Sequence, residues 1–147
     1  MAKKIVVGVV IGLIAGGILI QFIPYGRDHT NPPVVAEPQW DSQQTHDLAV
    51  RACYDCHSNQ TQWPWYSNIA PLSWLVQHDV DKGRAQLNFS QWNTSQRGAR
   101  EAAREVQAGR MPQWYYVLLH PSANLTPAEK QTLNQGLQRL AGVASRP

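Results

Sequence analysis

Residues 53–57 of the chain, Cys53-Tyr54-Asp55-Cys56-His57, combine two thiols and an imidazole at the spacing C-x-x-C-H. This spacing is the signature of covalent haem attachment. Two cysteines one helical turn apart lie on one face of a helix, where both thiols can add to the two vinyl groups of a haem. The adjacent histidine then directs its imidazole to the iron. The motif predicts one covalent haem c per chain, attached through Cys53 and Cys56, with His57 as the proximal iron ligand.

Three other interpretations of the two cysteines compete with haem attachment. A dithiol redox pair is expected in a thioredoxin-like strand–helix setting, and no strand is predicted before Cys53. A zinc site needs four ligands, and only further histidines could complete the set. A structural disulfide suits an exported domain but leaves His57 without a role.

Met111 is predicted to be the sixth, distal ligand of the iron. It lies in a break between predicted helices, outside the helical spacing at which a methionine usually fills a core. His78, on a predicted helix, is the alternative ligand, whereas His46 and His120 are predicted to be surface or capping histidines. Ligation by His and Met raises the reduction potential relative to two histidines, which suits an electron acceptor.

Aromatic side chains follow the motif in the loop and at the start of the next predicted helix. The four that we predict to contact the haem are Trp63, Trp65, Tyr66 and Trp74. Large rings can wall a porphyrin, and an indole N–H can donate to a propionate. Arg51, Arg84 and Arg110 are candidates for pairing with the propionates.

The chain after residue 40 shows helical apolar spacing and no convincing strand pattern, which predicts an all-α domain. The predicted helices span residues 42–53, 71–82, 95–108, 113–119 and 127–141. Asp41 is predicted to cap the first helix, and Gly83 to end the second. Thr126-Pro127-Ala128-Glu129 is a capping box that begins the last helix, which Gly142 is predicted to end.

The N-terminal residues 5–23 carry no charge and one strongly polar side chain, Gln21. As a helix at ~1.5 Å per residue they reach about 28 Å, close to the thickness of the hydrocarbon core of a bilayer. Lys3 and Lys4 favour a cytoplasmic N-terminus. We predict a single uncleaved anchor in the bacterial inner membrane, with the rest of the chain in the periplasm. The alternative is a cleaved signal peptide, but a cut near residues 15–17 leaves an exposed apolar end.

Residues 24–39 contain four prolines and little apolar pattern, which predicts a semi-extended tether. The predicted organisation is therefore an anchor at residues 1–23, a linker at 24–39 and a haem-binding domain at 40–147.

The charge of the chain excludes one class of partner. Two of its 13 basic residues precede the apolar run, whereas all ten acidic residues follow it, so the exported part is almost neutral. Nucleic-acid binding depends on a concentrated basic surface, and we predict none. No Ser/His/Asp set, paired catalytic carboxylates or phosphate-binding glycine loop is visible, which favours a carrier over an enzyme.

Several blocks in order resemble the haem-binding domain family of small bacterial c-type cytochromes. The blocks are Cys53-Tyr54-Asp55-Cys56-His57-Ser58-Asn59, Trp63-Pro64-Trp65-Tyr66-Ser67, Ile69-Ala70-Pro71, Leu87-Asn88-Phe89-Ser90-Gln91-Trp92, Gly109-Arg110-Met111-Pro112 and Leu119-His120-Pro121. The resemblance implies a cytochrome-c-like helical fold with His57 and Met111 as iron ligands. Gln113 stands where members commonly carry a second proline.

Together these features predict a membrane-anchored monohaem cytochrome c that passes single electrons to and from redox partners of the respiratory chain. The alternative is a haem-based sensor or peroxidase-like enzyme whose sixth ligand can be displaced.

Overall fold

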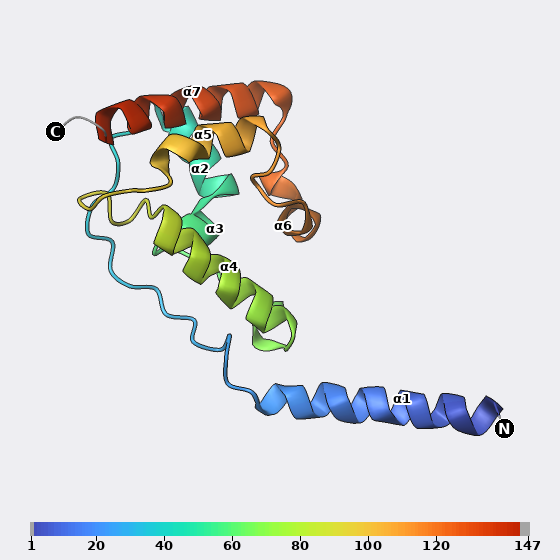
Figure 1. The fold of residues 1–147 in the computed structure, drawn as a ribbon. Coiled ribbons are helices and arrows are strands. Elements are labelled where there is room, and N and C mark those ends of the chain that lie inside the picture. The colour runs from blue at the N-terminus through green and yellow to red at the C-terminus, as the bar shows by residue number, and fades with distance from the viewer. Residues whose placement is uncertain (1, 145–147) are drawn as a thin grey trace. The chain divides into compact units, whose positions relative to one another are not determined.

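The computed structural model describes residues 2–144, and the regular elements in this part of the chain are all helices, joined by extended segments and loops, as Figure 1 shows. Its α-helices are α1 Ala2–Leu19, α2 Gln43–Ala52, α3 Tyr54–His57, α4 Leu72–Gln86, α5 Ala99–Gln107, α6 Trp114–Leu119 and α7 Pro127–Ala144. Short 3-10 turns span Ile20–Phe22, Trp65–Asn68 and Pro121–Ala123. No strand occurs in the described part, where Ala36 and Gln91 form an isolated bridge. The predicted all-α class is confirmed.

The described residues form two compact units. Residues 2–30 and 63–79 make the first, and residues 31–62 and 80–144 make the second. Helix α4 contributes residues to both units. The first unit contains α1, an apolar helix that is long enough to cross a membrane and has no buried residue.

Helix α2 begins one residue later than predicted and has a different cap. The Ser42 side chain accepts a hydrogen bond from the Thr45 backbone N–H at 3.1 Å, so Ser42 is the N-cap. The carboxylate of Asp41 instead pairs with Arg139 at 2.6 Å. The prediction of Asp41 as the cap was wrong because a long-range ion pair takes its side chain.

Both glycines that were predicted to end helices lie inside them. Helix α4 continues past Gly83 to Gln86, and the Leu87 N–H still donates to the Gly83 carbonyl at 2.9 Å. Helix α7 continues past Gly142 to Ala144. Glycine weakens a helix but ends it only where the chain turns into the left-handed region, and neither residue does so.

Helix α5 is shorter than predicted because the residues before it form a turn. The Gly98 N–H donates to the Gln86 carbonyl at 2.7 Å, and the Gln96 side chain bonds the backbone of Asn88 and Gln91. These contacts hold residues 95–98 outside the helix, which begins at Ala99.

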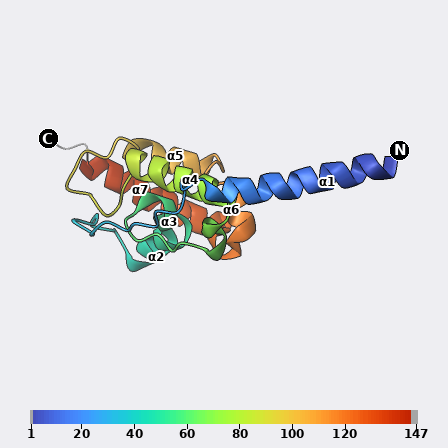
Figure 2. The same ribbon diagram turned by 90° about the horizontal axis from the view of Figure 1, so that it is seen from below.

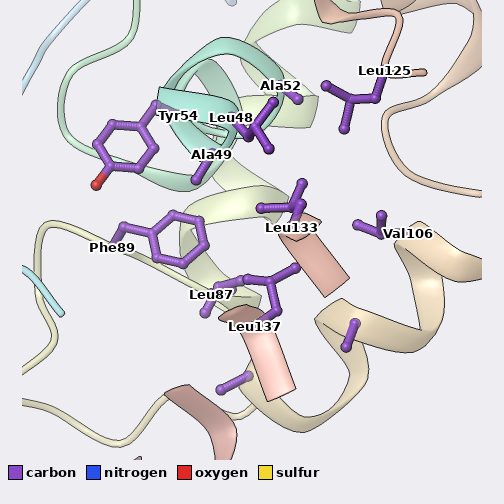
Figure 3. Close-up of a cluster of buried hydrophobic side chains, with 12 residues drawn as sticks. Leu48, Ala49, Ala52, Tyr54, Leu87, Phe89, Val106, Leu125, Leu133 and Leu137 are labelled. Carbon is purple, nitrogen blue, oxygen red and sulfur yellow. The ribbon is translucent and has the colours of Figure 1, made fainter. Parts of the chain in front are cut away.

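The core of the second unit lies where α2, α5 and α7 meet. Helices α5 and α7 pack side by side in both Figure 1 and Figure 2. Figure 3 shows the buried side chains of this core, with the ring of Phe89 beside that of Tyr54. Leu133 of α7 is fully buried. The partly buried side chains that pack against this core include Cys53 and Met111, so two predicted haem-site residues border one cluster.

Residues 31–39, the second half of the proline-rich stretch, run extended along the second unit. The N–H groups of Val35 and Ala36 donate to the Ser90 carbonyl at 2.9 and 3.2 Å. The Trp92 N–H donates to the Ala36 carbonyl at 2.9 Å. This part of the predicted tether is therefore paired with the domain.

The predicted capping box at the start of α7 is formed. The Thr126 N–H donates to a carboxylate oxygen of Glu129 at 2.7 Å, and the Glu129 N–H donates to the Thr126 hydroxyl at 3.3 Å. Arg51 of α2 adds an ion pair with Glu129 at 2.6 Å. The hydrogen bond from Arg51, and then those from Thr126, lower the pKa of Glu129 from its ordinary 4.5 to about 2.

We expect Glu129→Gln to lower stability near neutral pH and to reduce the loss of stability in acid. Because the folded-state pKa lies below the ordinary value, the unfolded chain binds more protons between the two values. The contribution of Glu129 is complete above pH 4.5 and is lost as the pH falls through about 2. Urea denaturation of the wild type and the variant, as full chains in detergent and at a series of pH values from neutral downward, measures the contribution of Glu129 to the free energy of unfolding.

Glu101→Gln is the matched control, since it removes an exposed ion pair with Arg104 and should change stability little. If the difference between Glu129→Gln and the wild type were the same at every pH, the expectation would be contradicted.

Candidate functional site

The C-x-x-C-H motif occupies the junction of α2 and α3. Cys53 is the C-cap of α2 and the N-cap of α3, and its N–H donates to the Ala49 carbonyl at 2.8 Å. The N–H groups of Cys56 and His57 both donate to the Cys53 carbonyl, at 3.2 and 2.9 Å. The two thiols are partly buried and form no disulfide. The junction therefore holds both thiols and the imidazole within one short turn of backbone.

The imidazole of His57 is oriented by two backbone carbonyls. Its Nδ1 lies 3.1 Å from the oxygen of Gly83 and 3.1 Å from the oxygen of Leu87. A carbonyl oxygen only accepts, so Nδ1 carries the hydrogen and Nε2 keeps its lone pair for a metal. Burial lowers the pKa of His57, while the bonds to Leu87 and Gly83 oppose that shift. The ring is therefore neutral and held in the tautomer that ligates through Nε2.

Gly83 allows α4 to approach the motif closely. A Cβ at this position would lie 2.2 Å from the carbonyl oxygen of Cys56 and 2.8 Å from its carbonyl carbon. Only glycine fits at this separation, and the approach brings the carbonyl of residue 83 to His57.

The segment after α4 also holds the backbone that follows His57. The Phe89 N–H donates to the His57 carbonyl at 2.8 Å, and the Asn59 N–H donates to the hydroxyl of Ser90 at 2.9 Å. The amide of Asn88 donates to the Asn59 side chain at 2.9 Å. Residues 87–92 are one of the blocks that carry the family resemblance, but the sequence alone predicted no role for them. The run of Asn and Ser beside buried Leu87 and Phe89 was the available signal.

Arg84 joins the same loop to the proline-rich segment. Its Nε–H donates to the Ser58 carbonyl at 2.8 Å, and its Nη2 donates to Thr61 and to Asn31, each at 2.9 Å. Burial lowers the pKa of Arg84, and the charge of Asp81 opposes the shift. Its guanidinium thus serves to brace the loop.

Met111 is positioned by the end of α5. Gly109, at φ +69°, turns the chain, and its N–H donates to the Val106 carbonyl at 3.1 Å. The N–H groups of Arg110 and Met111 both donate to the Glu105 carbonyl, at 3.0 and 3.1 Å. This is a Schellman termination, which needs a residue that tolerates the left-handed region. It leaves Met111 partly buried against the core.

A hydrogen bond links α6 to the motif. The Tyr116 hydroxyl donates to a carboxylate oxygen of Asp55 at 2.7 Å, and the other oxygen accepts from the Gln62 N–H at 2.9 Å. Burial, then the negative charge of Asp55, raise the pKa of Tyr116 well above its ordinary range. The ring of Tyr116 stacks on His120 at 4.1 Å. Sequence reasoning missed this contact, since nothing local marks Tyr116.

The alternative iron ligands have different surroundings. His78 is exposed and belongs to the first unit. His120 caps α6, where its N–H donates to the Tyr116 carbonyl at 2.8 Å. His46 is half-buried beside Trp40 and Tyr54.

The four predicted aromatic contacts belong to the first unit, whereas Cys53, Cys56, His57 and Met111 belong to the second. Their contact with haem therefore stays a prediction. Trp63 stacks on His29 at 4.5 Å, and its Nε1–H, like that of Trp74, is buried without a hydrogen-bond partner. Trp65 is 76% exposed and meets Tyr66 edge-to-face.

The three arginines named for propionates have partners within the protein. Arg51 pairs with Glu129, Arg84 braces the loop after His57, and Arg110 makes two 2.7 Å hydrogen bonds to the carboxylate of Glu105.

The donor set at the motif fits haem better than zinc or dithiol exchange. No cluster of three or more potential His, Cys, Asp or Glu ligands exists in residues 2–144, whereas a zinc site needs four ligands. Burial raises the pKa of the Cys53 thiol to about 12, whereas a redox-active cysteine needs a lowered pKa. A haem c site needs what the motif offers, which is two thiols and one imidazole with Nε2 available.

An all-helical fold that holds two thiols and an oriented imidazole on one turn defines a protein built to bind a prosthetic group. The chain matches the model of the haem-binding domain over residues 15–139, most of its length, and it belongs to that family. The predicted family is thereby confirmed, and with it a haem-binding domain. No curated protein and no solved structure matched the chain.

Proposed function

We propose that this protein is a membrane-anchored monohaem c-type cytochrome that transfers single electrons. The observation that carries the proposal is the orientation of His57 by the carbonyls of Gly83 and Leu87, next to the thiols of Cys53 and Cys56. A bound haem supplies the one-electron iron couple.

The residues of the chain have separate tasks in this proposal. Each thiol S–H adds across one vinyl C=C bond, sulfur to one carbon and hydrogen to the other, so attachment consumes no oxidant. His57 offers Nε2 to the iron, and the thioether of Met111 is the proposed sixth ligand. Met111 is favoured over His78 because it borders the same core as Cys53, whereas His78 is exposed.

The proposed location is supported by α1 and by the two lysines before its apolar residues. We propose that α1 spans the bacterial inner membrane once, with the haem-binding domain in the periplasm, where respiratory redox partners reach it. The positive residues at the short N-terminal end support this orientation.

A pyridine haemochrome spectrum of the full chain, produced with cytochrome c maturation enzymes, tests haem attachment. We expect haem to stay with the polypeptide after acid–acetone extraction in the wild type. The Cys53→Ala/Cys56→Ala double variant should lose it, and Gln44→Ala, an exposed change on α2, should not. Haem that extracts from the wild type would contradict covalent attachment and would favour a dithiol or a metal site at the motif.

The same material tests the sixth ligand. Met111→Ala should abolish the long-wavelength absorbance band that marks methionine–iron ligation, and His78→Ala should keep it. A wild-type protein that lacks this band and binds CO would favour the sensor or peroxidase-like alternative.

A further inference from the structure

The end of the anchor helix is tied to a segment far along the chain. Gln21 is the one strongly polar side chain of the apolar run, and its amide bonds both sides of Ala70. Its Nε2–H donates to the Ala70 carbonyl at 2.9 Å, and its Oε1 accepts from the Ala70 N–H at 3.0 Å. Figure 1 shows this end of α1 next to the beginning of α4. The Gln21 side chain thus forms hydrogen bonds with both backbone polar groups of a residue 49 positions later in the chain.

Two further contacts in the first unit strengthen this tie. Gly26, at φ +81°, lies so close to α4 that a Cβ there would be 2.4 Å from the Ser73 carbonyl oxygen. His29 stacks on Trp63 at 4.5 Å, and its Nε2 lies 3.1 Å from the Ser67 carbonyl oxygen. The chain that leaves the anchor is therefore held against residues 63–75 at three points.

The tied segment presents an apolar surface to solvent. Four of its side chains, which we call the juxtamembrane platform, are exposed by 76, 46, 42 and 42%: Trp65, Ile69, Leu72 and Leu75. Leu72 and Leu75 are three residues apart on α4 and share a face. Residues 63–77 contain no charged residue and no histidine. Solvation of such a surface by water is unfavourable.

The length of α1 relative to the bilayer indicates where the juxtamembrane platform lies. Residues 5–22, the uncharged part of this helix, reach about 27 Å at ~1.5 Å per residue, close to the thickness of the hydrocarbon core. In a bilayer that α1 spans, Gln21 therefore lies at the boundary between acyl chains and headgroups, and Ala70 is hydrogen-bonded to it. Trp side chains favour this boundary.

We propose that the juxtamembrane platform inserts into the headgroup–acyl boundary of the bilayer that α1 spans. The first unit thus contacts the membrane at two places, the spanning helix and the platform of Trp65, Ile69, Leu72 and Leu75. This inference rests on the membrane anchoring proposed above, and the bilayer lipid is its one occupant.

Photo-crosslinking in vesicles of phosphatidylethanolamine and phosphatidylglycerol tests the platform. The full chain carries p-benzoylphenylalanine in place of one residue at a time, Leu13 in the anchor, Trp65 or Leu72 in the platform, and Trp114 as control. Trp114 is a matched control because it is also 76% exposed but lies on α6, outside the first unit. All four side chains are exposed, so the changes leave the packing intact.

We expect lipid adducts, detected by mass spectrometry, at positions 13, 65 and 72, with at least about fivefold more adduct at 65 than at 114. Adducts at position 13 without adducts at 65 and 72 overturn the platform and leave the anchor standing. Equal amounts of lipid adduct at positions 65 and 114 also overturn the platform. No adduct at position 13 overturns the anchor itself.

Discussion

Gly83→Ala is expected to destabilise the protein by about 3 kcal/mol, although alanine is intrinsically the better helix former. A Cβ at this position would lie 2.2 Å from the Cys56 carbonyl oxygen, which is backbone and cannot rotate away. Either α4 or the motif must move by roughly 1 Å to restore normal contact in a close-packed interior.

The same displacement reaches the proposed iron ligand. The Gly83 carbonyl accepts a hydrogen bond from His57 Nδ1, so a shift of α4 lengthens it and releases the imidazole from its orientation. The variant should therefore also retain less covalent haem than the wild type when both are made with the same maturation enzymes.

Equilibrium denaturation of the full chain in detergent measures the loss of stability, and Gly142→Ala is the matched control. Gly142 is also helical, but a Cβ there would meet nothing within 4 Å. This variant should be more stable than the wild type by about 0.5–1 kcal/mol, as helix propensity alone predicts. A Gly83→Ala protein as stable as the wild type would show that α4 does not need this close approach.

Phe89→Ala is expected to cost about 3–5 kcal/mol, the usual range for removing a buried ring. Phe89 is 1% exposed and stacks with the rings of Tyr54 and Trp92, whose centroids are 5.4 and 5.9 Å away. Figure 3 shows the ring beside Tyr54 in the core. The loss comes from packing, because the Phe89 N–H that bonds the His57 carbonyl belongs to the backbone and is kept.

Urea denaturation compares this variant with Leu118→Ala. Leu118 is 71% exposed, so its loss should change the free energy of unfolding by less than about 0.5 kcal/mol. Phe89→Leu leaves a smaller cavity and should fall between the two, which keeps the test valid if Phe89→Ala does not fold. Equal stability of Phe89→Leu and the wild type would mean that the ring contributes little.

Features that depend on neighbouring residues were predictable from sequence. The apolar helix α1, the C-x-x-C-H turn and the capping box of Thr126 and Glu129 each depend on residues within a few positions of one another. The overall helical class was predictable for the same reason, since apolar periodicity is a local property. The family resemblance also came from blocks of sequence.

Features that depend on distant residues were decided by the tertiary structure. Gly83 was predicted to break a helix, whereas it lies inside α4 because its missing Cβ admits the Cys56 backbone. Its contact with His57 joins residues 26 positions apart, the contact of Gln21 with Ala70 spans 49 positions, and that of Tyr116 with Asp55 spans 61. The sequence by itself determined which residues offer thiols, an imidazole and an apolar N-terminal helix. Only packing decided which nitrogen of His57 is free, because the two carbonyls that hold the other one come from a helix and a loop folded back onto the motif.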